Sequence, residues 1–275
     1  MALLTIVTVV RNDADGLART LASVAAQDTA PDQLVVVDGS DDPTEVPRLV
    51  ADAGTLPVDY SWSAPRGVYA AMNEGLARVT ANYVYFLNAG DVLADGGVVG
   101  ALVDQLARHA PAWAFGRVEF LAEDGSANPQ PAWDYTAERA ALFARGRFPA
   151  HQGVLVRTDS LRAQGGFDLT YRVAADYRSI LRLAADGPPL DLDLTLAAFT
   201  VGGLSTQDWR RGLAEFHRAR REVFDPHGVD ALVEGGRTAS RWLATSAYRA
   251  LWAPGRPLAD LVARVRPGGA RATDR

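Results

Sequence analysis

The stretch from Asn82 to Asp91 constrains the fold of this chain more than any other. Its centre is a run of aromatic, β-branched and aliphatic residues, Tyr83-Val-Tyr-Phe-Leu87, which predicts a strand buried on both faces of a sheet. The run stops at a small, polar, turn-forming segment, Asn88-Ala-Gly-Asp91. Because open α/β sheets bind ligands just beyond the carboxyl ends of their strands, we expect Asp91 to lie at a ligand-binding edge. The alternative is that Asp91 only caps the helix that follows.

Strand and helix patterns alternate through the first part of the chain. Strand patterns precede and follow segments with helical spacing; they cover residues 3–10, 33–37 and 82–87, with a weaker strand over 58–62. This alternation predicts an α/β fold with a doubly wound, mainly parallel central sheet. A further helix over 96–109 and a strand over 113–121 are expected to follow.

The pattern is less regular after residue 121. We expect short elements there: a helix within 136–143, a strand over 151–157, helices over 158–164 and 176–185, and a strand over 196–201. The resulting domain prediction is one α/β domain over 1–206, made of a part to about residue 110 and a part over 111–206. Helices over 207–253 form a C-terminal extension, and the Pro-, Gly- and Arg-rich residues 254–275 form a flexible tail.

Composition excludes several classes of function. The net charge of −5 gives no support for nucleic acid as a partner. The chain has no cysteine, which excludes thiolate metal sites, and all its basic residues other than histidine are arginine, which excludes Schiff-base chemistry. We expect a cytoplasmic protein, because the N-terminus lacks the features of a signal peptide and no apolar run reaches the ~20 residues of a membrane span.

Four polar residues stand at ends of predicted elements: Asp38, Asp91, His151 and Asp176. Each has a purely structural alternative: Asp38 could form a turn, Asp176 could cap a helix, and His151 could be a structural hydrogen-bonding group. Together they favour a functional site more strongly, because a doubly wound sheet brings its strand ends to one edge. A nicotinamide-binding fold is excluded, since no Gly-x-Gly-x-x-Gly segment follows the first strand.

Five motifs in order resemble the family 2 glycosyltransferases of GT-A fold, in particular the subgroup found in exopolysaccharide and colanic-acid-type gene clusters. The resemblance covers about residues 3–206. The motifs are Thr5-Ile-Val-Thr-Val-Val-Arg-Asn12, Val35-Val-Val-Asp-Gly-Ser-Asp-Asp-Pro-Thr44, Arg66-Gly-Val-Tyr-Ala-Ala-Met-Asn-Glu-Gly75, Phe86-Leu-Asn-Ala-Gly-Asp91, and a block containing Ala150-His-Gln152, Gly166-Phe-Asp168 and Ala175-Asp-Tyr177.

The resemblance implies roles for the matching positions. Asp176 would be the general base, and Asp91 would ligate Mg²⁺ or Mn²⁺ on the donor diphosphate. His151, Gln152 and Tyr177 would lie on the acceptor side, within 111–206, whereas residues 1–110 would bind the nucleotide. The implied nucleotide-sugar contacts are Thr8, Val10, Asn12, Asp38, Arg66, Gly67, Asn73, Asn88, Ala89 and Gly90.

The chemistry of such a reaction matches these residue types. A divalent ion neutralises the charge that develops on a nucleoside diphosphate leaving group, and oxygen ligands suit Mg²⁺ or Mn²⁺. An aspartate that removes the proton of a sugar hydroxyl accelerates its attack by roughly 10²–10⁴-fold. Direct displacement with one base inverts the anomeric centre. The expected partners are therefore a nucleotide-diphospho-sugar donor and a glycan or lipid-linked acceptor, in cell-surface polysaccharide biosynthesis.

Three positions depart from the pattern of the subgroup. Pro65 and Ala70 replace aspartates, and Asn88 stands where many relatives have an acid. These departures leave open a catalytically weakened relative that binds nucleotide or glycan as an assembly subunit.

The C-terminal helices leave a further choice open. The arginines over 210–221 could form a solvated face or a cationic wall for a diphosphate or an anionic acceptor. The aromatic and basic residues over 237–252 could pack on the main domain or make peripheral contact with the inner face of a membrane.

Overall fold

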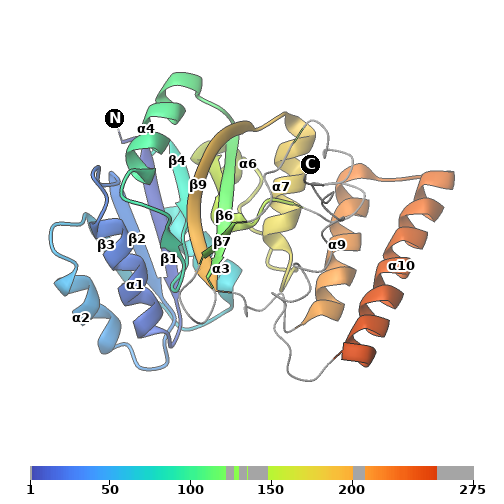
Figure 1. Cartoon of the computed structure of the whole chain (residues 1–275), viewed down its shortest axis with the longest axis horizontal. Helices are drawn as coiled ribbons and strands as arrows, with labels where there is room; N and C mark the ends of the chain where they lie inside the picture. Colours follow the sequence, from blue (N-terminus) through green and yellow to red (C-terminus); the bar gives the residue numbers. More distant parts are fainter. Residues whose placement is uncertain (1, 122–126, 130–134, 136–147, 201–207, 253–275) are drawn as a thin grey trace, which may run out of the picture. The chain divides into compact units, whose positions relative to one another are not determined.

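The computed structural model describes residues 2–121, 127–129, 135, 148–200 and 208–252. Their strands form one sheet with the order β3-β2-β1-β4-β8-β6-β9-β5, and β7 pairs with β6 (Figure 1). The strands β3, β2, β1 and β4 pair in parallel, as predicted for a doubly wound sheet. β8 then runs antiparallel between β4 and β6, so the second half of the sheet is mixed.

The elements of the parallel half lie close to their predicted positions. The strands are β1 (Leu4–Val10), β2 (Gln33–Asp38), β3 (Val58–Trp62) and β4 (Tyr83–Phe86). The helices are α1 (Ala14–Ala25), α2 (Glu45–Asp52), α3 (Val68–Arg78) and α4 (Val98–His109). The two-residue strand β5 (Val92–Leu93), which the sequence did not predict, precedes α4 and pairs antiparallel at the opposite edge of the sheet from β3.

Two strands of the second half begin elsewhere than predicted: residues 151–153 of the strand predicted over 151–157 form a 3₁₀ turn, and the strand predicted over 196–201 begins earlier. The elements of this half are β6 (Trp113–Leu121), β7 (Ala127–Pro129), the 3₁₀ turn η1 (His151–Gly153), β8 (Val154–Arg157), α6 (Thr158–Ala163), α7 (Ala175–Asp186), β9 (Leu190–Thr200), α9 (Trp209–Phe224) and α10 (Gly228–Trp252). β9 begins at Leu190 instead of residue 196, because leucines alternate with polar residues from that point, as in a half-buried strand. The helix predicted within 136–143 and the tail over 254–275 lie outside the described residues.

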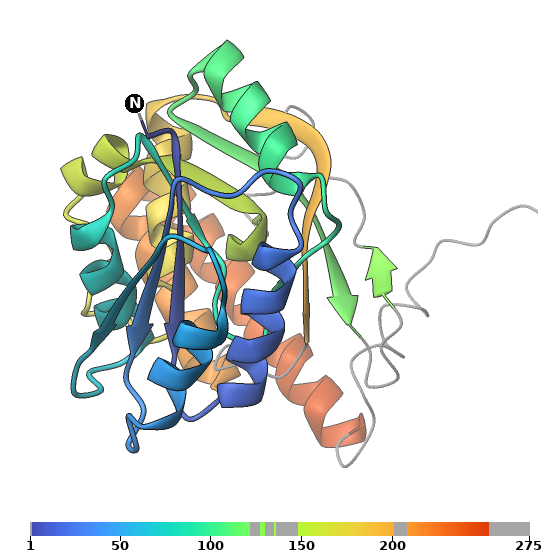
Figure 2. The same cartoon turned by 90° about the vertical axis from the view of Figure 1, so that its left-hand side faces the viewer.

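Apolar side chains cover both faces of the sheet. Alternate residues of β1 point to opposite faces: Leu4 and Ile6 pack in a cluster with α1 and α4, whereas Val7 and Val9 pack in a cluster with α3 and α7. Figures 1 and 2 show these helices on opposite sides of the strands. This two-sided burial explains why β1, β2 and β4 are rich in apolar residues along their whole length, whereas the edge strand β3 is only half-buried and carries Asp59 and Ser61.

The chain divides into two compact units at residue 227. The first unit, Met1–His227, contains the sheet together with α9, which packs on α7. The second unit begins at Gly228 and contains α10. Among the described residues, no helix is both long enough and apolar enough to cross a membrane.

Candidate active site

The turn after β4 presents Asn88, Ala89, Gly90 and Asp91 at the carboxyl edge of the parallel strands. The backbone of Ala89 donates to Val9 O (3.1 Å), which aligns the turn with the end of β1. The hydroxyl of Thr20, on α1, accepts a hydrogen bond from Gly90 N (3.1 Å) and lies 2.7 Å from Asp91 O. Gly90 has φ of 92°, a conformation that glycine adopts most readily. Thr20 therefore fixes the turn, a role that the sequence analysis did not assign.

Asp91 is a buried carboxylate. Only 8% of the residue is exposed, and burial raises the pKa of Asp91 to about 7, although hydrogen bonds from the Gln152 side chain and the Asn88 backbone oppose the shift. The Gln152 backbone oxygen accepts a hydrogen bond from the Tyr85 hydroxyl (2.6 Å), so Gln152 is held against β4. The structure thus brings Asp91 and Gln152 together, although they belong to different predicted halves of the domain.

A polar chain connects the turn to the start of α7 through His151. Asn88 Nδ2 lies 3.1 Å from His151 Nε2, and His151 Nδ1 lies 3.7 Å from Asp176 Oδ2. Burial lowers the pKa of His151, while Asp176 partly offsets this effect, so the imidazole is neutral at pH 7. If Asn88 donates to Nε2, the imidazole proton is on Nδ1 and faces Asp176. Asn88 Oδ1 is buried and has no hydrogen-bond partner among the described residues.

Asp176 lies in the first turn of α7 and is held on its other side by Tyr69. The Tyr69 hydroxyl lies 2.9 Å from Asp176 Oδ1 and 2.8 Å from Val173 O. Burial, followed by the charge of Asp176, raises the pKa of Tyr69, so the phenol stays protonated and can donate to the carboxylate. A cavity of about 20 Å³ is lined by Asp176, His151, Ser179 and apolar side chains. Asp176 therefore has the fixed orientation that a general base needs.

The predicted nucleotide contacts on β1 and β2 are buried below the edge of the sheet. Asp38 has no exposed surface, and its two carboxylate oxygens accept from Ser40 N (2.8 Å) and the Tyr60 hydroxyl (3.1 Å). Thr8 is also fully buried and donates to Leu87 O (2.8 Å), and Val10 packs in the apolar core. These three side chains therefore support the backbone at the carboxyl edge of the sheet from inside the protein.

The predicted contacts Asn12, Arg66 and Gly67 lie at the surface. Asn12 has φ of 53°, and its side-chain amide pairs with Asp41 through two hydrogen bonds (2.8 and 2.9 Å). Arg66 is exposed, 4.0 Å from Glu74, and Gly67 has φ of 104° at the start of α3. These residues and Asp38 come from neighbouring strands or the loops that follow them, as the sequence predicted.

Trp62 is an exposed aromatic side chain that the sequence analysis did not single out. It ends β3, is 47% exposed, and donates from Nε1 to Ser40 O (3.0 Å). A tryptophan at the end of the predicted strand over 58–62 was the available signal, because tryptophan side chains are rarely buried completely.

Two predicted site residues are engaged in structural contacts. Both ends of the Asn73 amide pair with the backbone of Phe167, at 2.7 and 2.8 Å. Tyr177 is fully buried, and its ring packs against Phe148 and Phe216 at centroid distances of 4.7 and 4.8 Å. Both residues therefore brace the segments around the site: Asn73 joins α3 to the loop before α7, and Tyr177 joins α7 to α9.

The turn after β4 contains two side chains whose oxygens could ligate a divalent ion. Within the described ranges, no group of three His, Cys, Asp or Glu side chains is placed to hold a metal. The turn offers one carboxylate, on Asp91, and one unpaired amide oxygen, on Asn88. These are oxygen donors of the kind that suit Mg²⁺ or Mn²⁺ when phosphates and water complete the coordination.

Comparison with known sequences identifies relatives along most of the chain. The profile of the family described as glycosyl transferase family 2 matches residues 5–163. An uncharacterized glycosyltransferase of Mycobacterium tuberculosis is 30% identical over 222 residues, which cover 78% of this chain and 81% of that protein. A PGL/p-HBAD biosynthesis glycosyltransferase of Mycobacterium bovis is 28% identical over 169 residues, which cover 60% of this chain and 63% of that protein.

Solved structures with the same fold include two glycosyltransferases. TarS of Staphylococcus aureus, in complex with UDP, has a TM-score of 0.64 at 16% identity, and the match covers 86% of this chain and 70% of that one. The mannosyltransferase PcManGT of Pyrobaculum calidifontis, in complex with GDP-Man and Mn²⁺, has a TM-score of 0.61 at 18% identity and covers 96% and 79%. At these identities the likeness establishes the fold and leaves the donor open.

Proposed function

This chain belongs to the family 2 glycosyltransferases and has the GT-A fold, and on that premise we propose that it is an inverting, metal-dependent enzyme. It transfers a sugar from a nucleotide-diphosphate donor to a hydroxyl group of a glycan or lipid-linked acceptor, in the synthesis of a cell-surface glycan. The contact of Asp176 with Tyr69 and His151 is the observation on which the proposal chiefly rests. Membership of the exopolysaccharide and colanic-acid-type subgroup stays a prediction.

The proposed reaction begins with proton transfer to Asp176. The carboxylate accepts the proton of the acceptor hydroxyl as that oxygen attacks the anomeric carbon. Its Oδ1 is already engaged by Tyr69, so Oδ2, which faces His151 at 3.7 Å, is the oxygen with more capacity to accept. A neutral His151 with its proton on Nδ1 steadies the charged carboxylate without neutralising it. Attack from the side opposite the diphosphate inverts the anomeric centre.

The diphosphate is proposed to bind over the turn between Asn88 and Asp91. Asp91 and the unpaired Asn88 Oδ1 would hold Mg²⁺ or Mn²⁺ together with the donor phosphates. When bound, the ion would neutralise charge on the leaving group. Ionisation of the buried Asp91 is favoured by a cation, which reverses the effect that burial has on its pKa.

The donor and acceptor are proposed by analogy with relatives. The structural neighbours hold UDP in one case and GDP-Man with Mn²⁺ in another, so uridine and guanosine donors are the first to examine. One relative is named for PGL/p-HBAD biosynthesis, and the lipid-linked acceptor proposed for this chain is the one predicted from the sequence motifs. Such an acceptor would be reached by peripheral contact of this chain with the membrane surface.

The proposal is tested with a panel of UDP-, GDP- and dTDP-sugars in the presence of Mn²⁺, assayed for hydrolysis and for transfer to glycan and lipid-linked acceptors. Asp176→Asn is expected to lose turnover by roughly 10²–10⁴-fold while keeping donor binding, because only the base is removed. Asp91→Ala is expected to lose Mn²⁺-dependent donor binding. Asp104→Asn, which changes an exposed carboxylate of α4, is the matched control.

The alternative is a binding subunit without catalysis, which the replacement of two expected aspartates by Pro65 and Ala70 favours. Wild-type protein that binds a nucleotide sugar but turns over none of the panel, with Asp176→Asn binding it equally well, would contradict the enzyme proposal and support this alternative.

A further inference from the structure

A buried carboxylate of α9 is hydrogen-bonded to the segment that leads into the proposed base. Glu215 is only 9% exposed, although it lies on a helix rich in exposed arginines. Its Oε1 accepts from Arg172 N (3.0 Å), and its Oε2 accepts from Val173 N (2.8 Å) and Ala174 N (2.9 Å). Three consecutive backbone N–H groups thus converge on one side chain.

These contacts anchor the segment that leads into α7, whose N-cap position has no side-chain acceptor. The residue before α7 is Ala174, which has no side-chain acceptor, so the N–H groups around the helix start need partners from elsewhere. Glu215 binds the N–H groups of residues 172–174, of which that of Ala174 lies at the helix start. A carboxylate with three N–H donors is a strong charge-assisted arrangement, which explains how Glu215 tolerates burial.

Val173 connects Glu215 to the carboxylate of the proposed base. Its N–H donates to Glu215, and its carbonyl oxygen lies 2.8 Å from the Tyr69 hydroxyl, which in turn lies 2.9 Å from Asp176 Oδ1. A shift of the Val173 peptide would therefore move the phenol that orients the base. We propose that Glu215 is a positioning residue, through which α9 sets the orientation of Asp176. This inference rests on the proposed function of Asp176.

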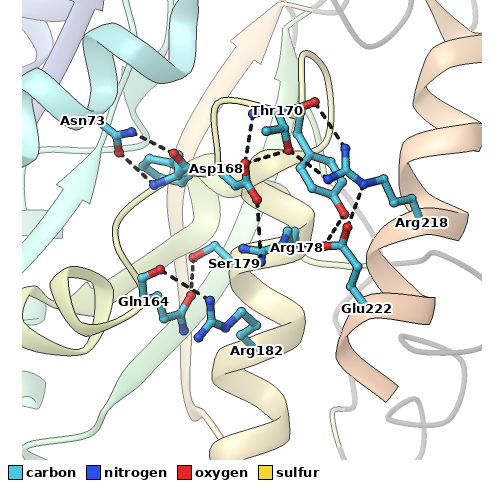
Figure 3. A network of polar contacts seen from close by, with 11 residues as sticks. Asn73, Gln164, Asp168, Thr170, Arg178, Ser179, Arg182, Arg218 and Glu222 are labelled. Atoms are coloured by element: carbon cyan, nitrogen blue, oxygen red, sulfur yellow. Dashed lines mark hydrogen bonds and ion pairs between the residues drawn. The ribbon is translucent and has the colours of Figure 1, made fainter. Parts of the chain in front are cut away.

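Other contacts hold the same loop at different points and supply a matched control. Figure 3 shows Asp168 paired with Arg178 (3.6 Å), and Glu222 of α9 paired with Arg178 (3.0 Å) and Arg218 (2.7 Å). Glu222 also accepts from the Tyr171 hydroxyl (2.9 Å). Like Glu215, Glu222 joins α9 to the loop and α7, but none of its contacts reaches the backbone of residues 172–174 or the Tyr69 hydroxyl.

The experiment compares Glu215→Gln and Glu215→Ala with Glu222→Gln in the full chain, using the nucleotide sugar that the donor panel identifies. Loss of the Val173 contact is expected to displace the base, and displacements of about 1 Å can cost 10²-fold in rate, so kcat of Glu215→Ala should fall by about that factor. The donor KM should stay unchanged, because the donor turn is not touched. Glu215→Gln keeps the shape of the side chain and part of its capacity to accept hydrogen bonds. Its kcat should therefore lie between that of Glu215→Ala and that of the wild-type protein.

Amide hydrogen exchange supplies a readout that needs no substrate. Protection of the amides of residues 172–174 is expected to fall in both Glu215 variants and to persist in Glu222→Gln, which should also keep the wild-type kcat. A wild-type kcat in Glu215→Ala would overturn the inference, as would an equal fall of kcat in Glu215→Ala and Glu222→Gln, which would indicate general loosening of α9.

Asp176→Asn in the same series separates this inference from the proposed function. If Asp176→Asn loses turnover while Glu215→Ala keeps it, only the positioning role of Glu215 is refuted. If Asp176→Asn keeps wild-type turnover, Asp176 is not the base, and the role of Glu215 in orienting it fails with the proposed function.

Discussion

The buried carboxylate of Asp91 predicts that the metal-free protein becomes more stable when this acid is replaced by its amide. The pKa of Asp91 is raised from 3.8 to about 7 by burial. Because the folded state binds this proton more tightly than the unfolded state, the associated stability is fully present below pH 3.8 and is lost as the pH rises to about 7. A difference of about 3 pH units corresponds to about 4 kcal/mol of folding free energy at and above neutral pH.

Asp91→Asn removes the ionisation and keeps the shape of the side chain, with an oxygen that can still accept from Gln152. The free energies of unfolding of the two proteins should therefore diverge with pH. Between pH 5 and pH 7 the advantage of the variant should grow by about 1.4 kcal/mol per unit, or about 2–3 kcal/mol in total, and it should then level off. The carboxylate of wild-type Asp91 accounts for the whole pH-dependent difference, since all other titrating groups are common to both proteins.

The assay is urea unfolding of each protein in a chelating buffer at several pH values. Asp104→Asn, at an exposed position on α4, should show no pH-dependent difference from wild type. Addition of Mn²⁺ with the correct nucleotide should make the wild-type protein more stable than Asp91→Asn, because a ligand that binds only the folded wild-type protein stabilises it. Parallel pH curves for wild type and Asp91→Asn would refute the argument, since they would mean that burial does not disfavour the charge.

Three further substitutions test individual contacts of the site. Tyr69→Phe keeps the ring stacked on Phe167 but removes the hydroxyl from Val173 and Asp176; we expect kcat to fall while donor affinity, measured by calorimetry, is retained. Thr20→Val leaves Gly90 N without its acceptor, which should cost about 1–3 kcal/mol of stability in thermal unfolding and should weaken Mn²⁺-dependent nucleotide binding. Asn73→Leu breaks both hydrogen bonds to the Phe167 backbone, so unfolding should require about 1–3 kcal/mol less free energy. An unchanged unfolding free energy with a large loss of donor affinity would instead assign Asn73 to the nucleotide site.

Sequence periodicity was sufficient to predict the parallel half of the sheet. β3 and β6 have the predicted bounds, 58–62 and 113–121, because each is a compact run of strand-forming residues between turn residues. The direction of β8 could not be predicted from periodicity, because a four-residue strand does not itself specify which strands it pairs with or in which direction. β8 lies antiparallel between β4 and β6, and this position brings His151 and Gln152 beside the turn after β4.

The sequence also predicted that Asp91, His151 and Asp176 would lie at one edge of the sheet. In the structure His151 lies beside Asp176 and Asn88, and Gln152 lies beside Asp91. The sequence could not predict the partners that orient these side chains. Tyr69 lies 107 positions from Asp176, and Glu215 lies 41 positions from Ala174, so only the packing of α3, α7 and α9 brings them together. A tyrosine on the apolar face of a predicted helix was the one available signal, since a buried phenol needs a hydrogen-bond partner.

Asn88, which stands where many relatives have an acid, favours a catalytically active site over an inactive one. His151 is neutral and lies between Asn88 and Asp176, and Asp91 is three residues along the same turn. A carboxylate at position 88 would place two acids against this imidazole and a third nearby, and this would favour the imidazolium form. A charged His151 would pair with Asp176 and lower its basicity. The neutral amide avoids that pairing, and it leaves Asp176 as the only carboxylate that contacts His151 in the described structure. The loss of one acid from the turn therefore preserves the proposed base on the other side of the imidazole.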